Sequence, residues 1–104
     1  MNRSFALAPS AESDALDIWE HLADTADEAI ADRVVARVYD ECQKLAEQPG
    51  LGHFREDLLS KRYRFWSAWS YLIVYRWNAR PIEVVAIVHG ARDLYVFFKR
   101  RKLR

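Results

Sequence analysis

The residues best suited to chemistry lie close together near the end of the chain: His89, Arg92 and Tyr95. A histidine can act as a general base, and an arginine can clamp a phosphate through paired N–H donors. A base, an acid and a cation are what metal-free cleavage of a phosphodiester requires. The sequence therefore makes these three residues candidate catalytic groups. In the alternative interpretation, His89 and Asp93 hold the end of a strand, and Arg92 pairs with a carboxylate on a helix.

The other reactive side chains give no sign of a metal site or of a nucleophilic centre. His21 and His53 stand in a helical and a loop context, without the Cys, His or Asp partners that a metal requires. Cys42 is the single cysteine, so no intramolecular disulfide is possible, and its place on a helical apolar stripe indicates a core residue. No serine or cysteine accompanies a histidine in a nucleophile arrangement. We therefore expect neither a metal nor another cofactor.

A second candidate set combines arginines with aromatic residues. Arg62, Arg64 and Arg76 are interleaved with aromatic side chains along the predicted strands. Such a pattern can stack single-stranded bases, but it is more often a core beneath a helical layer. Trp69 is interpreted as an exposed anchor, because exposed tryptophans are frequent in binding hot spots. These four residues are predicted to bind a protein partner.

The C-terminal segment is strongly basic. Residues 92–104 hold six basic residues against Asp93 alone, a net charge of +5, and we predict that they contact the target of the protein: Arg92, Lys99, Arg100, Arg101, Lys102 and Arg104. The apolar residues 94–98 would dock the segment on the sheet or the helices. The alternative is a solvated tail that offsets acidic helices. Residues 99–104 are read as a terminal tail whose deletion should spare folding.

Composition indicates one soluble domain that spans residues 1–104. The chain is 51% hydrophobic and 13% aromatic, which argues against disorder. Its longest uncharged run, residues 65–75, is too short to cross a bilayer as a helix, and the N-terminus lacks a signal-like apolar region. Residues 10–57 have a net charge of −9 and residues 58–104 a net charge of +9. A cytoplasmic protein with a basic face for an acidic partner or nucleic acid fits these features, as does internal neutralisation.

The strongest structural signal is a β-hairpin. Residues 70–77 and 82–89 are β-branched and aromatic runs that flank a short turn containing Pro81. Alternation separates Leu72, Val74 and Arg76 from Tyr71, Ile73, Tyr75 and Trp77 in the first strand. In the second strand it separates Ile82, Val84, Ala86 and Val88 from Glu83, Val85, Ile87 and His89. Both faces are largely apolar, so the hairpin should be the buried centre of a sheet that residues 3–8 and 61–68 extend.

Two amphipathic helices are predicted between the first two strands. The first follows Pro9, with Ser10 as a possible cap. Residues 25–28 resemble a capping box that opens the second helix, which runs to Gln48. Its apolar stripe is Ala31, Val34, Val35, Val38, Cys42 and Leu45. An antiparallel helix pair on a mainly antiparallel sheet makes an α+β sandwich of two layers, with the order β-α-α-β-β-β and a C-terminal tail.

Three motifs follow this helix pair, and together they resemble the ParE/RelE superfamily of bacterial toxins, in its ParE branch. They are Pro49-Gly-x-Gly-x-x-Arg-x-Asp-Leu58, Ser70-Tyr-Leu-Ile-x-Tyr-Arg76 and His89-Gly-Ala-Arg-Asp-Leu94. The resemblance covers nearly the whole chain. It implies the fold described above, a cytoplasmic location, a cognate ParD-like antitoxin and inhibition of DNA gyrase. Relatives of RelE type instead cut mRNA on the ribosome.

The sequence differs from the RelE-type nucleases of this superfamily at the positions of their catalytic residues. RelE-type nucleases place basic residues on the middle strands and a tyrosine or histidine near the C-terminus. In this sequence the third-strand position matches Leu72, and the C-terminal position falls near Phe98. The second-strand positions fall near Tyr63 and Phe65, although Arg62 and Arg64 are adjacent to them. We therefore expect a toxin that binds gyrase and has no sequence-specific nucleic-acid contact. An mRNA endoribonuclease and a non-toxic binding module are the alternatives.

Overall fold

The computed structural model describes residues 5–103. Arg3, at the start of the predicted first strand, and Arg104, one of the predicted target-binding residues, lie outside the described residues. The elements are β1 (Phe5–Leu7), α1 (Pro9–Thr25), α2 (Glu28–Glu47), a 3₁₀ turn (Pro49–Leu51), β2 (Tyr63–Ala68), β3 (Tyr71–Arg76), β4 (Ile82–His89) and α3 (Leu94–Arg101). Within this range no helix is long and apolar enough to cross a membrane.

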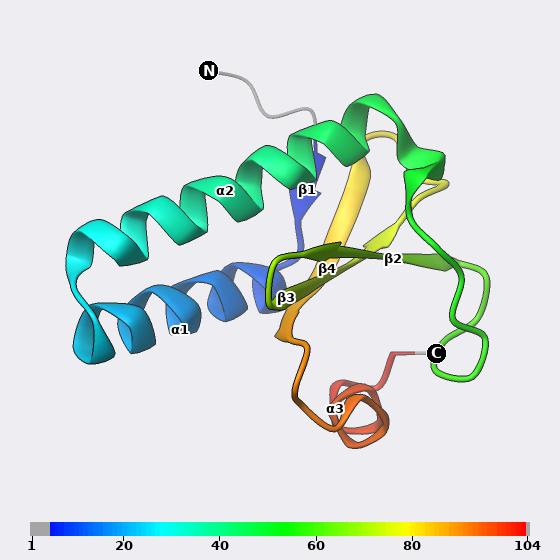
Figure 1. The fold of residues 1–104 in the computed structure, drawn as a ribbon. Coiled ribbons are helices and arrows are strands. Elements are labelled where there is room, and N and C mark those ends of the chain that lie inside the picture. Colours follow the sequence, from blue (N-terminus) through cyan, green and yellow to red (C-terminus); the bar gives the residue numbers. More distant parts are fainter. Residues whose placement is uncertain (1–4, 104) are drawn as a thin grey trace.

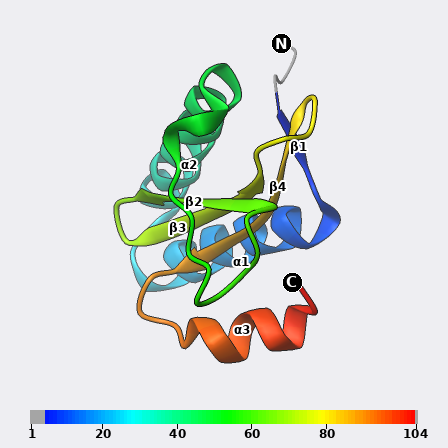
Figure 2. The same cartoon turned by 90° about the vertical axis from the view of Figure 1, so that its right-hand side faces the viewer.

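The strands form one mixed sheet in the order β1-β4-β3-β2. The β2–β3 and β3–β4 pairs are antiparallel, whereas β1 runs parallel to β4. The α1–α2 hairpin lies on one side of the sheet, and α3 lies apart from it, beneath the sheet in Figure 2. The predicted α+β fold and its element order through β4 are confirmed.

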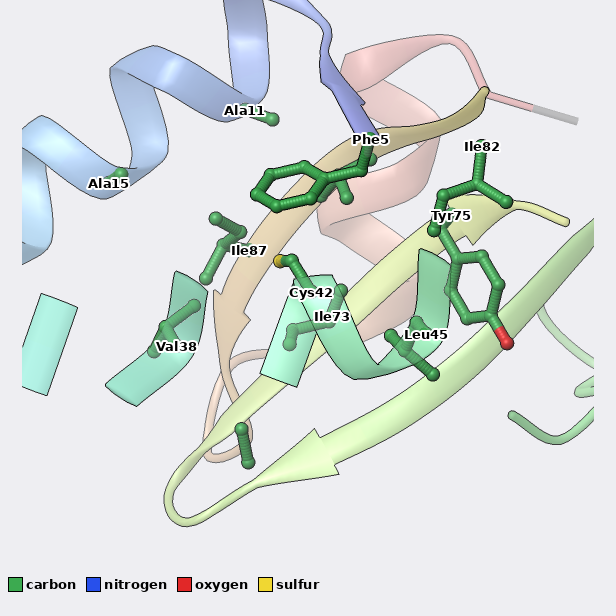
Figure 3. Packing of buried hydrophobic residues seen from close by; sticks show 12 residues of the cluster. Phe5, Ala11, Ala15, Val38, Cys42, Leu45, Ile73, Tyr75, Ile82 and Ile87 are labelled. Carbon is green, nitrogen blue, oxygen red and sulfur yellow. The ribbon is translucent and has the colours of Figure 1, made fainter. Parts of the chain in front are cut away.

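The main core lies between the helix pair and the sheet. Ala31, Val38, Cys42 and Leu45 of α2 are at most 2% exposed, as the predicted stripe requires. Figure 3 shows Val38, Cys42 and Leu45 turned toward the strand residues Ile73, Tyr75 and Ile87, with Phe5 beside them. The position of Cys42 as a buried core residue is confirmed. Full burial of a Leu or Val side chain contributes about 1.5–3 kcal/mol, so this stripe is what holds α2 on the sheet.

The segment predicted as a tail is a helix that adds a third layer. Asp93 caps α3 by accepting a hydrogen bond from the Val96 backbone N–H at 3.1 Å. Phe98 is 2% exposed and meets the Phe65 ring edge-on at 5.7 Å. The opposite face of the sheet and α3 thus share a second apolar cluster, whose buried members are Leu59, Tyr63, Phe65, Val74, Val85, Ala86, Val88 and Phe98. The prediction of a two-layer sandwich with a C-terminal tail is corrected in this respect.

The strict alternation predicted for β4 is wrong beyond Val84, because the strand contains a β-bulge. Val74 pairs with Ala86 and Tyr75 pairs with Val84, which leaves Val85 as an extra residue. A bulge shifts the side chains after it to the other face. Val84 and Ile87 therefore face the helix pair, whereas Ala86 and Val88 lie in the cluster beneath α3. The bulge also leaves the Val85 carbonyl available to groups outside the sheet.

Both predicted helix caps are corrected. Asp27 caps α2, since its side chain accepts from the Ile30 N–H at 2.8 Å. Thr25 instead ends α1, and its hydroxyl donates to the His21 carbonyl. Ser10 lies inside α1, and its hydroxyl donates to the Val85 carbonyl at 3.2 Å. Ser10 therefore ties α1 to the β4 bulge.

The loop after α2 is fastened to the sheet by Tyr75. The Gly52 N–H donates to the Tyr75 hydroxyl at 3.0 Å, and that hydroxyl donates to the Pro49 carbonyl at 2.6 Å. Burial raises the pKa of Tyr75. The hydroxyl therefore stays protonated at neutral pH and can make both hydrogen bonds.

Replacing Gly52 with alanine should destabilise the protein by about 1–3 kcal/mol, because the new methyl group has no room. A Cβ atom there would lie 2.6 Å from the Tyr75 hydroxyl and 2.9 Å from the Phe65 carbonyl oxygen, whereas nothing lies within 4 Å of one at Gly50. Urea denaturation of Gly52→Ala and of the control Gly50→Ala measures the difference. Equal unfolding midpoints for the two variants would contradict the expectation.

Candidate functional site

The outward side of α3 presents a continuous basic and apolar surface, which we call the α3 face. It consists of Tyr95, Val96, Lys99 and Arg100, which helical spacing places on one side of α3, and of Arg92, which lies just before the helix. All five are exposed, and Tyr95 and Val96 keep 65% and 43% of their surface accessible. The inward side consists of Leu94, Phe97, Phe98 and Arg101. The predicted docking of residues 94–98 as a block is thus corrected, since Tyr95 and Val96 point away from the core.

Arg101 fixes α3 to α1 and to the β4 bulge. Its guanidinium donates to Asp14 Oδ1 at 2.8 Å and to the Val85 carbonyl at 3.2 Å. Asp14 also accepts from the Ile87 backbone N–H at 3.0 Å. The Arg101 and Asp14 side chains are only 22% and 12% exposed. Arg101, predicted to bind a target, therefore has its guanidinium engaged inside the protein, where it positions the α3 face.

His89 and Arg92 lie at the corner between β4 and α3. The His89 Nδ1 accepts from the Ala91 N–H at 3.1 Å, and its ring meets Tyr71 edge-on at 5.5 Å. The Arg92 guanidinium lies 5.3 Å from the centre of the Phe97 ring. Among the described residues, no side-chain hydrogen bond links His89, Arg92 and Tyr95 to one another. Arg92 has no ion pair with a described carboxylate, and Asp93 caps α3, so these two parts of the alternative interpretation are corrected. His89 does hold the end of β4, through its hydrogen bond from the Ala91 N–H.

A cleft of about 450 Å³ separates this corner from α1. Apolar residues of α1, β4 and α3 form much of its lining, and His21, Asp17, His89 and Arg92 also contribute. Burial raises the pKa of Tyr71, which also lines the cleft, so its hydroxyl is protonated at neutral pH. Residues 5–103 contain no group of three or more His, Cys, Asp or Glu side chains placed to hold a metal ion.

The four predicted partner-binding residues do not form one surface. Trp69 is 57% exposed at the β2–β3 turn, where the Arg37 guanidinium lies 5.1 Å from its ring centre. Arg64 lies near the other end of β2, with its guanidinium packed against the rings of Phe54 and Trp77, at 4.1 Å and 4.5 Å from their centres. Arg62 and Arg76 lie beyond it, and both are exposed. Sequence alternation identified the strand but not this division into two ends.

Four residues at or near the matching nuclease positions lie together in one apolar cluster, whereas the adjacent Arg62 and Arg64 are not part of it. Tyr63, Phe65 and Phe98 are 6%, 3% and 2% exposed, and Leu72 packs against the same cluster beneath α3. A group that transfers protons to RNA must reach solvent and substrate. In this chain the corresponding surface of the sheet is filled by hydrophobic packing.

Comparison with known proteins places the chain in a recognisable group. The model of the family described as the ParE toxin of the type II toxin–antitoxin system, parDE, matches residues 5–94. None of the curated proteins matches the chain significantly. Among solved structures, the chromosomal ParDE TA system from P. aeruginosa contains a chain that superposes with a TM-score of 0.69 at 18% identity, covering 83% of this chain and 94% of that one. The family match ends at the first residue of α3, so most of the α3 face lies beyond it.

Proposed function

Because this chain belongs to the ParE toxin family of type II toxin–antitoxin systems, we propose that it inhibits DNA gyrase by binding and that a cognate antitoxin neutralises it. The proposal has three parts: a binding mode of action, the α3 face as the contact with gyrase, and an antitoxin that covers other parts of the surface. It implies that the protein acts in the cytoplasm, where gyrase is found.

The observation that carries the proposal is the covering of the sheet by α3. RNA cleavage without a metal needs an acid, a base and cations at the reacting phosphate. At or near the four positions that the resemblance assigns to such groups stand Tyr63, Phe65, Leu72 and Phe98, which share the apolar cluster between the sheet and α3. A protein that works by binding needs a stable exposed surface and no proton transfer. The packing of α3 therefore favours inhibition by binding over mRNA cleavage.

The α3 face has the composition of a protein-binding surface. Tyrosine and arginine are enriched in binding hot spots, and Tyr95 stands between Arg92 and Lys99 on this face. Its three cations favour an acidic region of gyrase and would speed association through long-range attraction. The Asp14–Arg101 ion pair at 2.8 Å holds the helix in place before binding, which reduces the entropy lost on association.

The antitoxin is proposed to contact Trp69, Arg62, Arg64 and Arg76. Because they lie at two ends of β2, one compact domain would not reach them all as easily as an extended segment that folds on binding. Such a segment would wrap the molecule. We therefore expect the toxin to accumulate poorly by itself and to purify with a small antitoxin that is partly disordered when free.

Two parallel assays test the proposed activity. Purified protein is added to gyrase in a DNA supercoiling assay and to translating ribosomes in an mRNA cleavage assay. The proposal requires inhibition of supercoiling that the antitoxin relieves, with no cut mRNA. Cleavage of mRNA without inhibition of supercoiling would instead establish the ribonuclease. Activity in neither assay would indicate the non-toxic module.

Replacing His89 with glutamine, or Tyr95 with phenylalanine, should change gyrase inhibition less than about threefold, within 0.7 kcal/mol. Both variants remove a titrating group and largely keep the shape of the side chain. The measurement is the concentration that halves supercoiling activity, with circular dichroism as the folding control. A loss of inhibition above tenfold in a folded variant would indicate that proton transfer contributes to the activity, which would support the mRNA endoribonuclease alternative.

A further inference from the structure

The β3–β4 turn lies at the end of the molecule away from the α1–α2 connection (Figure 1). The residues of this turn and of the segment just before β2 line a small basic pocket. It has a volume of about 280 Å³ and is lined by Lys61, Arg62, Arg76, Trp77, Asn78 and Ala79. Three of these residues are cationic and none is acidic. The pocket lies outside the α3 face, and two of its residues, Arg62 and Arg76, are also among the proposed antitoxin contacts.

The register of the sheet brings these residues together. Tyr63 pairs with Arg76, so the residues just before β2 lie beside the residues just after β3. The indole N–H of Trp77 donates to the Lys61 carbonyl at 2.8 Å, which closes this end of the strand pair. Backbone pairing thus determines which residues meet at the pocket.

The positive charge of the pocket is only partly neutralised within the protein. Lys61 reaches Glu56 at 3.4 Å, and Arg76 reaches Glu83 at 3.5 Å. Both ion pairs are solvent-exposed, and such pairs contribute roughly 0–1 kcal/mol, so they open easily for a competing anion. Arg62 is exposed and makes neither a hydrogen bond nor an ion pair with any residue that the structure describes. The pocket therefore presents one unpaired cation and two weakly paired ones.

An aromatic wall stands beside these cations. Besides its hydrogen bond to Lys61, the Trp77 ring packs against the Arg64 guanidinium at 4.5 Å and meets the Phe54 ring edge-on at 6.0 Å. Arg64 itself donates to the Gly52 carbonyl at 2.8 Å. An indole held in this way loses little entropy when a flat group stacks near it. In nucleic-acid binding sites, cations contact the phosphate and an aromatic ring stacks on the base. The pocket combines both kinds of group.

We propose that this pocket binds a phosphoryl group carried by a nucleotide or by a nucleic-acid strand. Arg62 supplies a planar fork of N–H donors to the phosphoryl oxygens, and Lys61 and Arg76 add charge. The Asn78 amide is a further donor to the anion, and Trp77 offers its ring to the base. Because the contacts are to phosphate and to the face of a base, recognition is independent of sequence.

The test is an NMR titration of the full chain at about 0.1 M salt, where the Debye length is about 10 Å and long-range attraction is largely screened. The probes are pyrophosphate, ADP with EDTA and a short oligothymidylate. We expect the Arg62 amide and Trp77 indole resonances to shift and to saturate below about 1 mM pyrophosphate. Tighter binding of ADP than of the oligonucleotide identifies a free nucleotide as the ligand, and the opposite order identifies a strand.

Arg62→Ala should weaken pyrophosphate binding by about tenfold, since it removes a charge-assisted contact. The control is Arg33→Ala, which removes the same charge from an exposed position on α2 and should change binding less than about twofold. Equal losses in the two variants would mean general attraction to a cationic protein and would overturn the proposal. Shifts that do not saturate, or that spare Arg62 and Trp77, would overturn it as well.

Discussion

Replacing Tyr95 with serine and Arg100 with glutamine in one variant should weaken gyrase inhibition by about 100-fold or more. Each substitution removes a side chain of a type that commonly contributes 2 kcal/mol or more at a binding hot spot. Tyr95 is 65% exposed and Arg100 makes no ion pair with a described residue, so neither change removes a contact that holds the fold. The loss should appear in the concentration that halves DNA supercoiling.

The matched control for this variant lies on the helix pair. Leu16, which is 55% exposed on α1, is replaced by serine, and Arg33, exposed on α2, is replaced by glutamine. This control loses one exposed hydrophobic side chain and one positive charge, as the α3 variant does. Its inhibition of gyrase should stay within about threefold of the parent protein. Similar inhibition by both variants would remove the α3 face from the mechanism.

Replacing Arg101 with methionine should destabilise the protein by about 1–3 kcal/mol. The change leaves Asp14, only 12% exposed, without its 2.8 Å ion pair and leaves the Val85 carbonyl with one donor fewer. Leaving a largely buried polar group without its partner commonly costs about 1–3 kcal/mol, because the group stays desolvated. Chemical denaturation followed by circular dichroism measures the free energy of unfolding.

Arg100→Met is the control, since Arg100 is exposed one position earlier in the same helix, and it should change stability by less than about 0.5 kcal/mol. Adding Asp14→Asn to Arg101→Met should restore part of the loss, because no uncompensated charge remains. Equal unfolding midpoints for Arg101→Met and Arg100→Met would contradict the assigned role of Arg101. Deletion of residues 99–104 removes Arg101 too, so we no longer expect that truncation to spare folding.

Patterns confined to a few neighbouring residues were sufficient for most of the fold. The stripe from Ala31 to Leu45 predicted which side of α2 is buried, and alternation predicted the faces of β3. The bulge at Val85 could not be predicted from the sequence, because residues 84–88 are all apolar. In such a run an extra residue leaves no mark in the periodicity.

The candidate site was only partly predictable, because its order depends on distant contacts. The basic residues of 92–104 pointed to the α3 face, but an eight-residue helix with five apolar residues in succession resembles a buried strand or a docked tail. The partner of Arg101 is Asp14, which is 87 positions away and lies among several acidic residues of α1. The sequence does not show which of these carboxylates pairs with Arg101. In the structure, the Ile87 N–H that follows the bulge donates to Asp14 and places this carboxylate beside Arg101.

The same contacts decide when the toxin becomes complete during its synthesis. The hydrogen bond from Ser10 to Val85 joins residues 75 positions apart, and the Asp14–Arg101 ion pair joins residues 87 positions apart. Neither contact can form until the later residue of the pair has been synthesised. Such long-range closures are entropically costly and belong to the slow steps of folding. α3 therefore cannot be fixed to α1 and to the β4 bulge until residue 101 has been synthesised, and the α3 face is held in place only from that point of synthesis onward.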